Sequence, residues 1–344
     1  MSVPARAQRA VLGAILALLF AACSGAGAGP SAASPEAVTA APTGTPASPS
    51  PAPLSPSPAA AFPVSVTDDE GTIVEIATEP ARIVSLTPAT TEILFAIGAG
   101  DSVIATTDFD DYPPEAVELP DVASFTSVDV EQIVGLEADL VIAGGNNFND
   151  PEAISRLRTL GVPVVVTYAA DIDGVLRDIE LVGTATGHAA AARDLVAAMR
   201  AGFDDVAAAV AAEDRPRVFY ELDATSEIYT AADDSFVEEM IELAGGDPIT
   251  TGSTTSFSIS LERLIDADPE IILLGDAAYG VTPDQVTNRP GWPVMTAVRE
   301  GRIVPVNDIV VTRPGPRLVE GLRQLTAAIH PDVALPTPAP APAY

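Results

Sequence analysis

Residues 130–142 read VEQIVGLEADLVI and residues 261–273 read LERLIDADPEIIL, so the two stretches align without a gap at an offset of 131. Each follows a residue that caps helices well, Asp129 in one copy and Ser260 in the other. A short helix with one apolar face then leads into an apolar run typical of a buried strand. This internal repeat predicts two related α/β lobes, one built around each copy.

Helices and apolar strands alternate on both sides of the repeat. The predicted strands cover 72–76, 82–86, 102–106, 139–143, 162–167, 217–222, 271–274 and 302–306. The predicted helices cover 88–97, 130–136, 151–160, 172–187, 188–213, 235–244, 261–267, 292–298 and 316–329. Continuous apolar strands in such an alternation indicate buried and largely parallel sheets.

The longest predicted helix covers 188–213, where apolar residues recur at three- and four-residue spacing. At 1.5 Å per residue it would be about 39 Å long. The predicted fold is therefore of the α/β class. It has two Rossmann-like lobes, over 64–187 and 214–332, which this single helix bridges.

The composition excludes several classes of protein. The chain has 17 basic and 48 acidic residues and a net charge of −31, and every basic residue is an arginine. P-loop nucleotidases, protein kinases and pyridoxal enzymes need a lysine that is missing here. Phosphate backbones would repel so acidic a chain, so we expect no nucleic-acid partner. One cysteine and two histidines cannot build a closed Cys/His zinc site, and we predict no metal ligands.

The N-terminus resembles an export signal. Arg6 and Arg9 precede an apolar run over 11–22, which is too short to span a bilayer but suits the core of a signal peptide. Small residues then precede Cys23, as in a bacterial lipobox. We predict a signal peptide over 1–22 and lipidation of Cys23, which would anchor the protein outside the cytoplasm on a bacterial cell membrane. The alternative is an ordinary secretory signal followed by a stray cysteine.

Two segments lack the composition of a packed core. Residues 24–63 contain ten prolines and one charged residue. We therefore predict that 23–63, with the lipidated cysteine at its start, is an extended tether between membrane and body. Residues 333–344 have the same character and are predicted to be a disordered tail.

Each copy of the repeat places a glutamate in the first turn of its helix, Glu131 and Glu262. One such carboxylate is explained by its interaction with the helix dipole, worth about 0.3–1 kcal/mol. Two at equivalent positions suggest another use, in which each lobe presents one anion to a two-fold symmetric partner.

Several segments now identify a family resemblance. Besides the two glutamate helices, they are RIVSLTPATTE at 82–92, GAGD at 98–101, DYPPEA at 111–116, AGG at 244–246 and RPGPR at 313–317. Their order and spacing over about 80–330 resemble the substrate-binding proteins of ABC importers for vitamin B12, iron–siderophores and heme. The resemblance implies a ligand cleft between the two lobes and limited closure of the lobes. It also implies that Glu131 and Glu262 pair with arginines on the two permease subunits.

Within the family the sequence is most similar to the cobalamin binders, chiefly at 111–114. The positions that match ligand-contacting residues of those proteins are occupied by Phe109, Phe125, Tyr229, Asp308 and Arg313. Aromatic faces would cover a flat macrocycle, and a few polar groups would orient its amide rim.

The sequence also departs from the cobalamin binders. Ser256 stands where they carry a tryptophan, although Phe257 is next to it, and 144–147 read GGNN where they carry an aromatic residue. The cleft is therefore expected to be less aromatic, and an iron–siderophore or heme is the alternative ligand. The two histidines, His188 and His330, lie at predicted helix ends. The candidate iron ligands are therefore the tyrosines at 168, 229 and 279.

Two other classes of function compete with transport. An exported hydrolase would need a nucleophile and a base, yet the chain contains neither G-x-S-x-G nor H-E-x-x-H. A surface lipoprotein for sensing or adhesion could use the same fold without transport. We predict a monomeric, tethered binding protein without a cofactor or enzymatic activity. It would deliver a cobalt or iron chelate, with a corrinoid favoured, to an ABC permease dimer and its ATPase.

Overall fold

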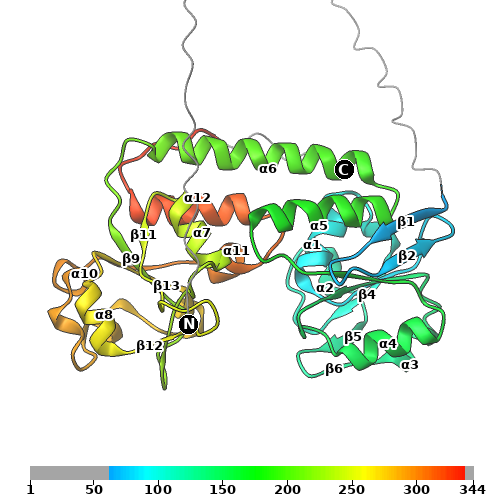
Figure 1. Cartoon of the computed structure of the whole chain (residues 1–344), viewed down its shortest axis with the longest axis horizontal. Helices are drawn as coiled ribbons and strands as arrows, with labels where there is room; N and C mark the ends of the chain where they lie inside the picture. Colours follow the sequence, from blue (N-terminus) through cyan, green and yellow to red (C-terminus); the bar gives the residue numbers. More distant parts are fainter. Residues whose placement is uncertain (1–61, 338–344) are drawn as a thin grey trace, which may run out of the picture. The chain divides into compact units, whose positions relative to one another are not determined.

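The structure is a computed structural model that describes residues 62–337 (Figure 1). The predicted signal peptide, Cys23, nearly all of the predicted tether and the last part of the predicted tail lie outside the described residues. Within 62–337, no helix is both long and apolar enough to cross a membrane.

The N-terminal lobe is built on a six-stranded sheet in the order β6-β5-β4-β3-β7-β8. All neighbouring strands are parallel except β5 and β6. The strands are β3 (Ile83–Ser85), β4 (Val103–Thr107), β5 (Asp121–Ser124), β6 (Ser127–Val128), β7 (Leu140–Gly144) and β8 (Val164–Thr167). A separate antiparallel pair is formed by β1 (Val64–Thr67) and β2 (Ile73–Ile76).

Helices cover both faces of this sheet. They are α1 (Pro88–Ala96), α2 (Pro114–Val117), α3 (Val130–Gly135), α4 (Pro151–Thr159) and α5 (Ile172–Ala185), with a 3₁₀ turn, η1 (Gly100–Ser102). Alternation along the strands divides the core, since Ile83 packs with α1 and α5 whereas Val84 packs with α3 and α4. Both residues are fully buried.

The C-terminal lobe is built on a four-stranded, wholly parallel sheet in the order β11-β9-β13-β14. Its strands are β9 (Arg217–Glu221), β11 (Asp247–Pro248), β13 (Ile271–Leu274) and β14 (Ile303–Pro305), and β10 (Ile228–Tyr229) pairs separately with β12 (Ser258–Ile259). The helices are α7 (Phe236–Leu243), α8 (Leu261–Ala267), α9 (Pro283–Thr287), α10 (Thr296–Glu300), α11 (Asp308–Thr312) and α12 (Leu318–Ile329), with 3₁₀ turns η2 (Gly275–Tyr279) and η3 (Trp292–Val294).

The two sheets share one plan, which confirms the repeat. In each lobe the strand after the glutamate helix, β7 or β13, lies between the first strand of the main sheet, β3 or β9, and the next strand along the chain, β8 or β14. The order β4-β3-β7-β8 in one lobe therefore corresponds to β11-β9-β13-β14 in the other. Both glutamate helices begin at the predicted caps, since Asp129 accepts a hydrogen bond from Gln132 N and Ser260 accepts one from Arg263 N.

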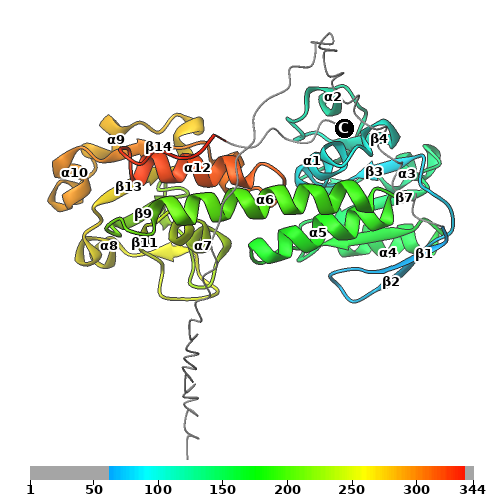
Figure 2. The same cartoon turned by 90° about the horizontal axis from the view of Figure 1, so that it is seen from above.

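One long helix, α6 (Ala189–Val210), bridges the lobes as predicted. It has 22 residues and begins at His188, its N-cap, so it is somewhat shorter than the predicted 188–213. Figure 2 shows it passing over both lobes, alongside α5 of the first and α12 of the second. Its buried face joins a single apolar core that contains strands of both sheets, at Leu195, Met199, Phe203 and Val206. Because this core is continuous, α6 is a stiff connection rather than a flexible linker.

Some predictions of local structure were wrong. The predicted helix over 292–298 is two short pieces, η3 and α10, because Met295 between them is extended. The helix α11 was missed; Asn307 caps it by accepting a hydrogen bond from Ile309 N. In the described part of the predicted tail, Leu335 packs against the core and Pro336 O accepts a hydrogen bond from Arg323.

Candidate ligand-binding site

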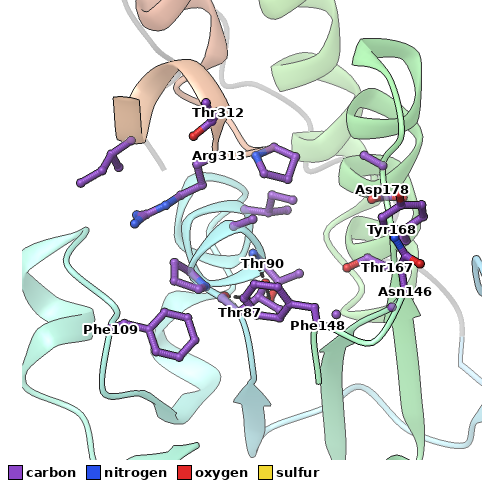
Figure 3. Close-up of a pocket in the computed structure, with 18 of the residues that line it drawn as sticks. Thr87, Thr90, Phe109, Asn146, Phe148, Thr167, Tyr168, Asp178, Thr312 and Arg313 are labelled. Carbon is purple, nitrogen blue, oxygen red and sulfur yellow. Dashed lines mark hydrogen bonds between the residues drawn. The ribbon is translucent and has the colours of Figure 1, made fainter. Parts of the chain in front are cut away.

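A cavity of about 600 Å³ lies between the two lobes (Figure 3). The N-terminal lobe lines it with the segments that follow β3, β4, β5, β7 and β8, and the C-terminal lobe with 308–314. These segments leave the carboxyl ends of parallel strands, which is the edge where open α/β sheets bind ligands. The predicted cleft therefore exists, and it is built mainly by the N-terminal lobe.

Aromatic side chains form one wall of the cavity. The rings of Phe109 and Phe125 are stacked, with centroids 4.0 Å apart and planes at 19°. Phe148 lies 6.1 Å from Phe109 at an angle of 56°. Phe125 is 74% exposed and Phe148 47% exposed, so the wall presents uncovered apolar faces. Such a surface suits a large flat ligand.

The structure brings together four of the six predicted ligand-binding residues. Phe109, Phe125, Asp308 and Arg313 all line the cavity. Tyr229 and Phe257 do not line it and instead lie close together at the β10–β12 pair, where Thr230 N donates to Phe257 O.

Tyr229 is near carboxylates rather than near the cavity wall. Its hydroxyl donates to Glu227 over 3.4 Å, and the charge of Glu227 raises the pKa of Tyr229. A phenol with a raised pKa is a poorer anionic iron ligand at neutral pH. Binding roles for Tyr229 and Phe257 therefore remain predictions.

The one cationic side chain among the described lining residues, Arg313, is already paired. Its Nη1 atom donates to Glu92 Oε1 over 2.7 Å and to Asp111 Oδ1 over 2.5 Å. Arg317 donates to both oxygens of Glu92, over 2.9 and 2.6 Å. Glu92 lies on α1 of the N-terminal lobe and is only 3% exposed, whereas both arginines belong to the C-terminal lobe. We call Glu92, Arg313 and Arg317 the interlobe clamp.

Asp308 is held in place by two hydroxyl groups. Tyr220 donates to Asp308 Oδ1 over 2.8 Å, and Thr312 donates to Oδ2 over 3.2 Å. Burial raises the pKa of Asp308, while these two hydrogen bonds act in the opposite direction. Its carboxylate is thus oriented on the cavity wall by the C-terminal lobe itself.

A second carboxyl group on the lining is protonated at neutral pH. Asp178 on α5 is 6% exposed, and burial together with Asp69 beside it raises its pKa to about 9. It can therefore act as a hydrogen-bond donor. Sequence reasoning missed Asp178, because a single aspartate in a helix carries no local sign of burial.

Sequence reasoning also missed Phe148. The loop 144–147 has no aromatic side chain, but Phe148 follows it directly and lines the cavity. Gly144 allows the close approach, since a Cβ atom there would lie 2.9 Å from a ring carbon of Phe148 and 2.7 Å from the Thr87 methyl group. Phe148 therefore supplies an aromatic side chain next to this strand end, where none was expected from the sequence.

The histidines lie away from the cavity. His188 Nδ1 is 2.9 Å from Thr186 O, and the buried His330 has its Nε2 atom 3.1 Å from Gly245 O. Tyr168 does line the cavity and is 48% exposed. In residues 62–337, no group of three His, Cys, Asp or Glu side chains is placed to hold a metal ion.

Glu131 and Glu262 occupy the first turns of α3 and α8 and are both exposed. Figure 1 shows these helices on the side of the lobes remote from α6, one in each lobe. Glu131 forms an ion pair with Arg156 over 3.5 Å, with the two side chains 85% and 60% exposed. Within the described residues, the Glu262 carboxylate has no hydrogen bond or ion pair.

Two α/β lobes, a long bridging helix and a cavity between the lobes together define a bilobal ligand-binding protein. The chain belongs to the periplasmic binding protein family, whose model matches residues 83–308.

Individual relatives differ in the ligand that they are named for. A protein of Bacillus subtilis named uncharacterized ABC transporter substrate-binding lipoprotein YvrC is 33% identical over 276 residues, which cover 79% of this chain and 87% of that protein. The cobalamin-binding protein of Halobacterium salinarum is 33% identical over 286 residues, covering 78% of this chain and 75% of that protein. The structure of the periplasmic heme-binding protein RhuT from Roseiflexus sp. RS-1 superposes with a TM-score of 0.64 at 29% identity, covering 73% of this chain and 98% of that one.

Proposed function

We propose that this chain is the extracytoplasmic substrate-binding component of an ABC importer and that it captures cobalamin or a related corrinoid. It acts as a monomer without catalysis and delivers the ligand to a permease dimer driven by an ATPase. Family membership supports a binding role, and the names of the Bacillus and Halobacterium relatives support import and cobalamin.

The charge of the cavity supports a corrinoid over an anionic iron chelate. Its cation, Arg313, is neutralised by Glu92 and Asp111, and the described lining adds only the carboxylate of Asp308 and the protonated carboxyl group of Asp178. An anionic ligand, such as hemin or a ferric catecholate, would find no unpaired cation on the described lining. A macrocycle rimmed by neutral amides would instead stack on the aromatic wall and hydrogen-bond to hydroxyl and amide side chains.

Calorimetric titration of the full chain with cyanocobalamin, hemin, a ferric catecholate and a ferric hydroxamate tests this choice. We expect micromolar or tighter binding of cyanocobalamin and binding of hemin at least about tenfold weaker, a difference of about 1.4 kcal/mol. Binding of a siderophore without any binding of cyanocobalamin would overturn the proposal.

An iron chelate is the second candidate, and the exposed phenol of Tyr168 on the cavity wall favours it. A tyrosinate bound to ferric iron gives a charge-transfer absorption band. If hemin or a ferric chelate binds, Tyr168→Phe should remove that band, and its persistence would exclude Tyr168 as a ligand.

The proposal includes docking of the permease through Glu131 and Glu262 and anchoring through a lipid on Cys23. The exposed positions of the two glutamates, one on each lobe, support the docking role. Anchoring is tested by cell fractionation, in which Cys23→Ser should move the protein from the membrane fraction to the soluble fraction. An unchanged membrane fraction would exclude the lipid anchor.

A further inference from the structure

The hairpin of β1 and β2 contacts the sheet beside one part of the cavity wall. Residues 167–169 line the cavity at the end of β8, which is an edge strand. The turn over 68–72 lies against this strand, since Asp69 N donates to Val166 O over 3.1 Å and Val166 N donates to Asp68 Oδ2 over 3.3 Å. The hairpin is therefore attached to β8 directly before the chain enters the cavity wall.

The turn itself is held by Asp68, which is only 4% exposed. Its Oδ1 atom accepts a hydrogen bond from Thr72 N over 2.7 Å, and its Oδ2 atom accepts one from Arg158 Nη2 over 2.8 Å. Arg158 belongs to α4, so the turn is fixed both within itself and to the body of the lobe. This gives the neighbouring side chain, Asp69, a defined position.

The carboxylate of Asp69 contacts two components of the cavity wall. Its Oδ2 atom accepts a hydrogen bond from Tyr168 N over 2.6 Å. Its side chain also forms a hydrogen bond with the side chain of Asp178 on α5. Tyr168 and Asp178 both line the cavity, whereas Asp69 does not (Figure 3). Asp69 can therefore act on the cavity only through these two residues.

The position of Tyr168 also affects the aromatic wall. Gly145 N donates to Thr167 O over 2.9 Å, and a Cβ atom at Gly145 would lie 3.1 Å from the Cβ atom of Tyr168. Phe148 N in turn donates to Gly145 O over 3.1 Å. A shift of Tyr168 would therefore displace the loop that carries Phe148.

We propose that Asp69 is a positioning residue of the ligand site, whose carboxylate fixes Tyr168 and Asp178 and thereby makes the hairpin part of the binding machinery. The hairpin precedes residues 83–308, the segment that the family model matches. The expected effect on affinity rests on the proposed function, because it requires a ligand in this cavity.

The contact between Asp69 and Asp178 needs a proton. Two ionised carboxylates would repel each other, whereas protonated Asp178 donates to Asp69. Burial, the hydrogen bond with Asp69 and the charge of Asp69 raise the pKa of Asp178 to about 9, and the charge of Arg177 acts in the opposite direction. The contact should therefore be present at neutral pH and be lost as the pH rises through about 9.

The first test needs no ligand and measures hydrogen exchange at the amide of Tyr168 in the full chain at pH 7. In Asp69→Ala this amide loses a charged acceptor, so we expect exchange at least about tenfold faster than in the wild type. Asp69→Asn keeps an acceptor oxygen and should restore most of the protection. Wild-type protection in Asp69→Ala would overturn the inference.

The matched control is Glu70→Ala. Glu70 is an exposed acid of the same turn, and its carboxylate pairs with Arg158 over 3.4 Å rather than with the cavity wall. Exchange at Tyr168 should stay within about twofold of the wild type in this variant.

The second test is calorimetric titration with cyanocobalamin and with hemin from pH 6 to pH 10. For the probe that the wild type binds, Asp69→Ala should weaken binding about tenfold at pH 7 and Glu70→Ala less than about twofold. The wild type should lose affinity above about pH 8, as Asp178 ionises beside Asp69. Asp178→Asn should remove this pH dependence, because an amide donates to Asp69 at every pH. A role in folding alone would not produce a pH dependence that Asp178→Asn removes.

Two results of the titrations would also overturn the inference. One is wild-type affinity in Asp69→Ala, which would leave Asp69 with a structural role only. The other is the same loss of affinity above pH 8 in Asp178→Asn as in the wild type, which decides the question even if Asp69→Ala does not fold. If the wild type binds neither probe, the proposed function fails, and the exchange measurement still decides whether Asp69 positions the wall.

Discussion

The two lobes repeat the same construction outside the ligand-binding edge. In the N-terminal lobe, Arg82 Nε donates to Leu136 O at the end of α3 over 2.8 Å. In the C-terminal lobe, Arg217 Nε donates over 3.0 Å to Ala267 O, which lies 131 positions after Leu136 at the end of α8. The backbone N–H groups of these arginines donate to carboxylates that also correspond at this offset, those of Asp139 and Glu270.

The turn after each glutamate helix is also conserved between the lobes. Glu137 has φ of 54° and Asp268 has φ of 44°, both in the left-handed region that side chains other than glycine rarely adopt. The same backbone turn thus leads from the glutamate helix into the central strand in both lobes. The framework that presents Glu131 and Glu262 is therefore a true structural repeat.

The lobes differ at the carboxyl ends of their strands. The N-terminal lobe carries the aromatic wall there, whereas the C-terminal lobe carries buried charge. Glu221 at the end of β9 is fully buried and receives two hydrogen bonds from Arg289, over 2.6 and 2.8 Å. The two lobes therefore share one framework but differ at the carboxyl ends of their strands. The N-terminal lobe provides apolar contact there, whereas the C-terminal lobe provides charged groups that are held in fixed orientations.

The largest expected effect comes from reversing the charge of both glutamates for which a docking role is proposed. Replacing Glu131 and Glu262 by arginine in one variant should reduce uptake of labelled cobalamin about 100-fold or more. Like charges would then face the arginines of the permease, which costs several kcal/mol. Calorimetry should show ligand affinity unchanged within about twofold. Wild-type uptake in this double variant would remove the docking role and favour a sensor or adhesion protein.

The single reversals sharpen the comparison. Glu131 has an exposed ion pair with Arg156, which is worth about 0–1 kcal/mol, and Glu262 has none in the described structure. We therefore expect the two single variants to lose uptake to within about fivefold of each other. A loss of uptake in only one of the two single variants would show that the permease does not bind the two lobes in the same way.

The next largest effect concerns the interlobe clamp, whose ion pairs join the two lobes. Glu92→Gln should lower the free energy of unfolding by about 3 kcal/mol, because it leaves two largely buried guanidinium groups without their shared carboxylate. Urea unfolding followed by circular dichroism measures this value. Glu131→Gln is the matched control in an exposed ion pair and should cost about 0.5 kcal/mol or less. Equal losses in the two variants would show that the clamp contributes no more than a surface pair.

A further comparison separates the buried acids of the two lobes by pH. Burial and Asp69 raise the pKa of Asp178 to about 9, and burial and Glu221 raise the pKa of Asp276 to about 7. Both groups have an ordinary pKa near 3.8, so the folded state binds more protons than the unfolded state above that pH. Each group's contribution to stability is complete below about pH 4 and is lost as the pH rises to its folded value, at up to about 1.4 kcal/mol per pH unit.

Unfolding free energies measured from pH 5 to pH 9 test this difference. The unfolding free energy should fall less steeply with pH in Asp178→Asn than in the wild type over the whole range. In Asp276→Asn it should fall less steeply only up to about pH 7. Between pH 7.5 and 9, the slope of Asp276→Asn should match that of the wild type. A wild-type slope for Asp178→Asn in that interval would contradict the protonated state of Asp178.

Much of the predicted site came from the resemblance to the cobalamin binders. Phe109, Phe125, Asp308 and Arg313 were predicted from it and line the cavity, whereas Tyr229, predicted in the same way, does not. Phe148 was missed because the expected aromatic position was sought one residue too early. Asp178 was missed because its importance depends on burial against Asp69, more than 100 residues away in the chain.

The sequence by itself determined the repeat, the helix caps at Asp129 and Ser260, the buried strands and the bridging helix, because these depend on residues that are close together in the chain. Only the tertiary structure decided which charges meet. Glu92 and Arg313 are 221 positions apart, yet they form an ion pair 2.7 Å long that ties the lobes together and neutralises the cation of the cavity. Electrostatic interactions depend on distance in space and on burial, and folding alone brings these groups within reach of each other and out of water.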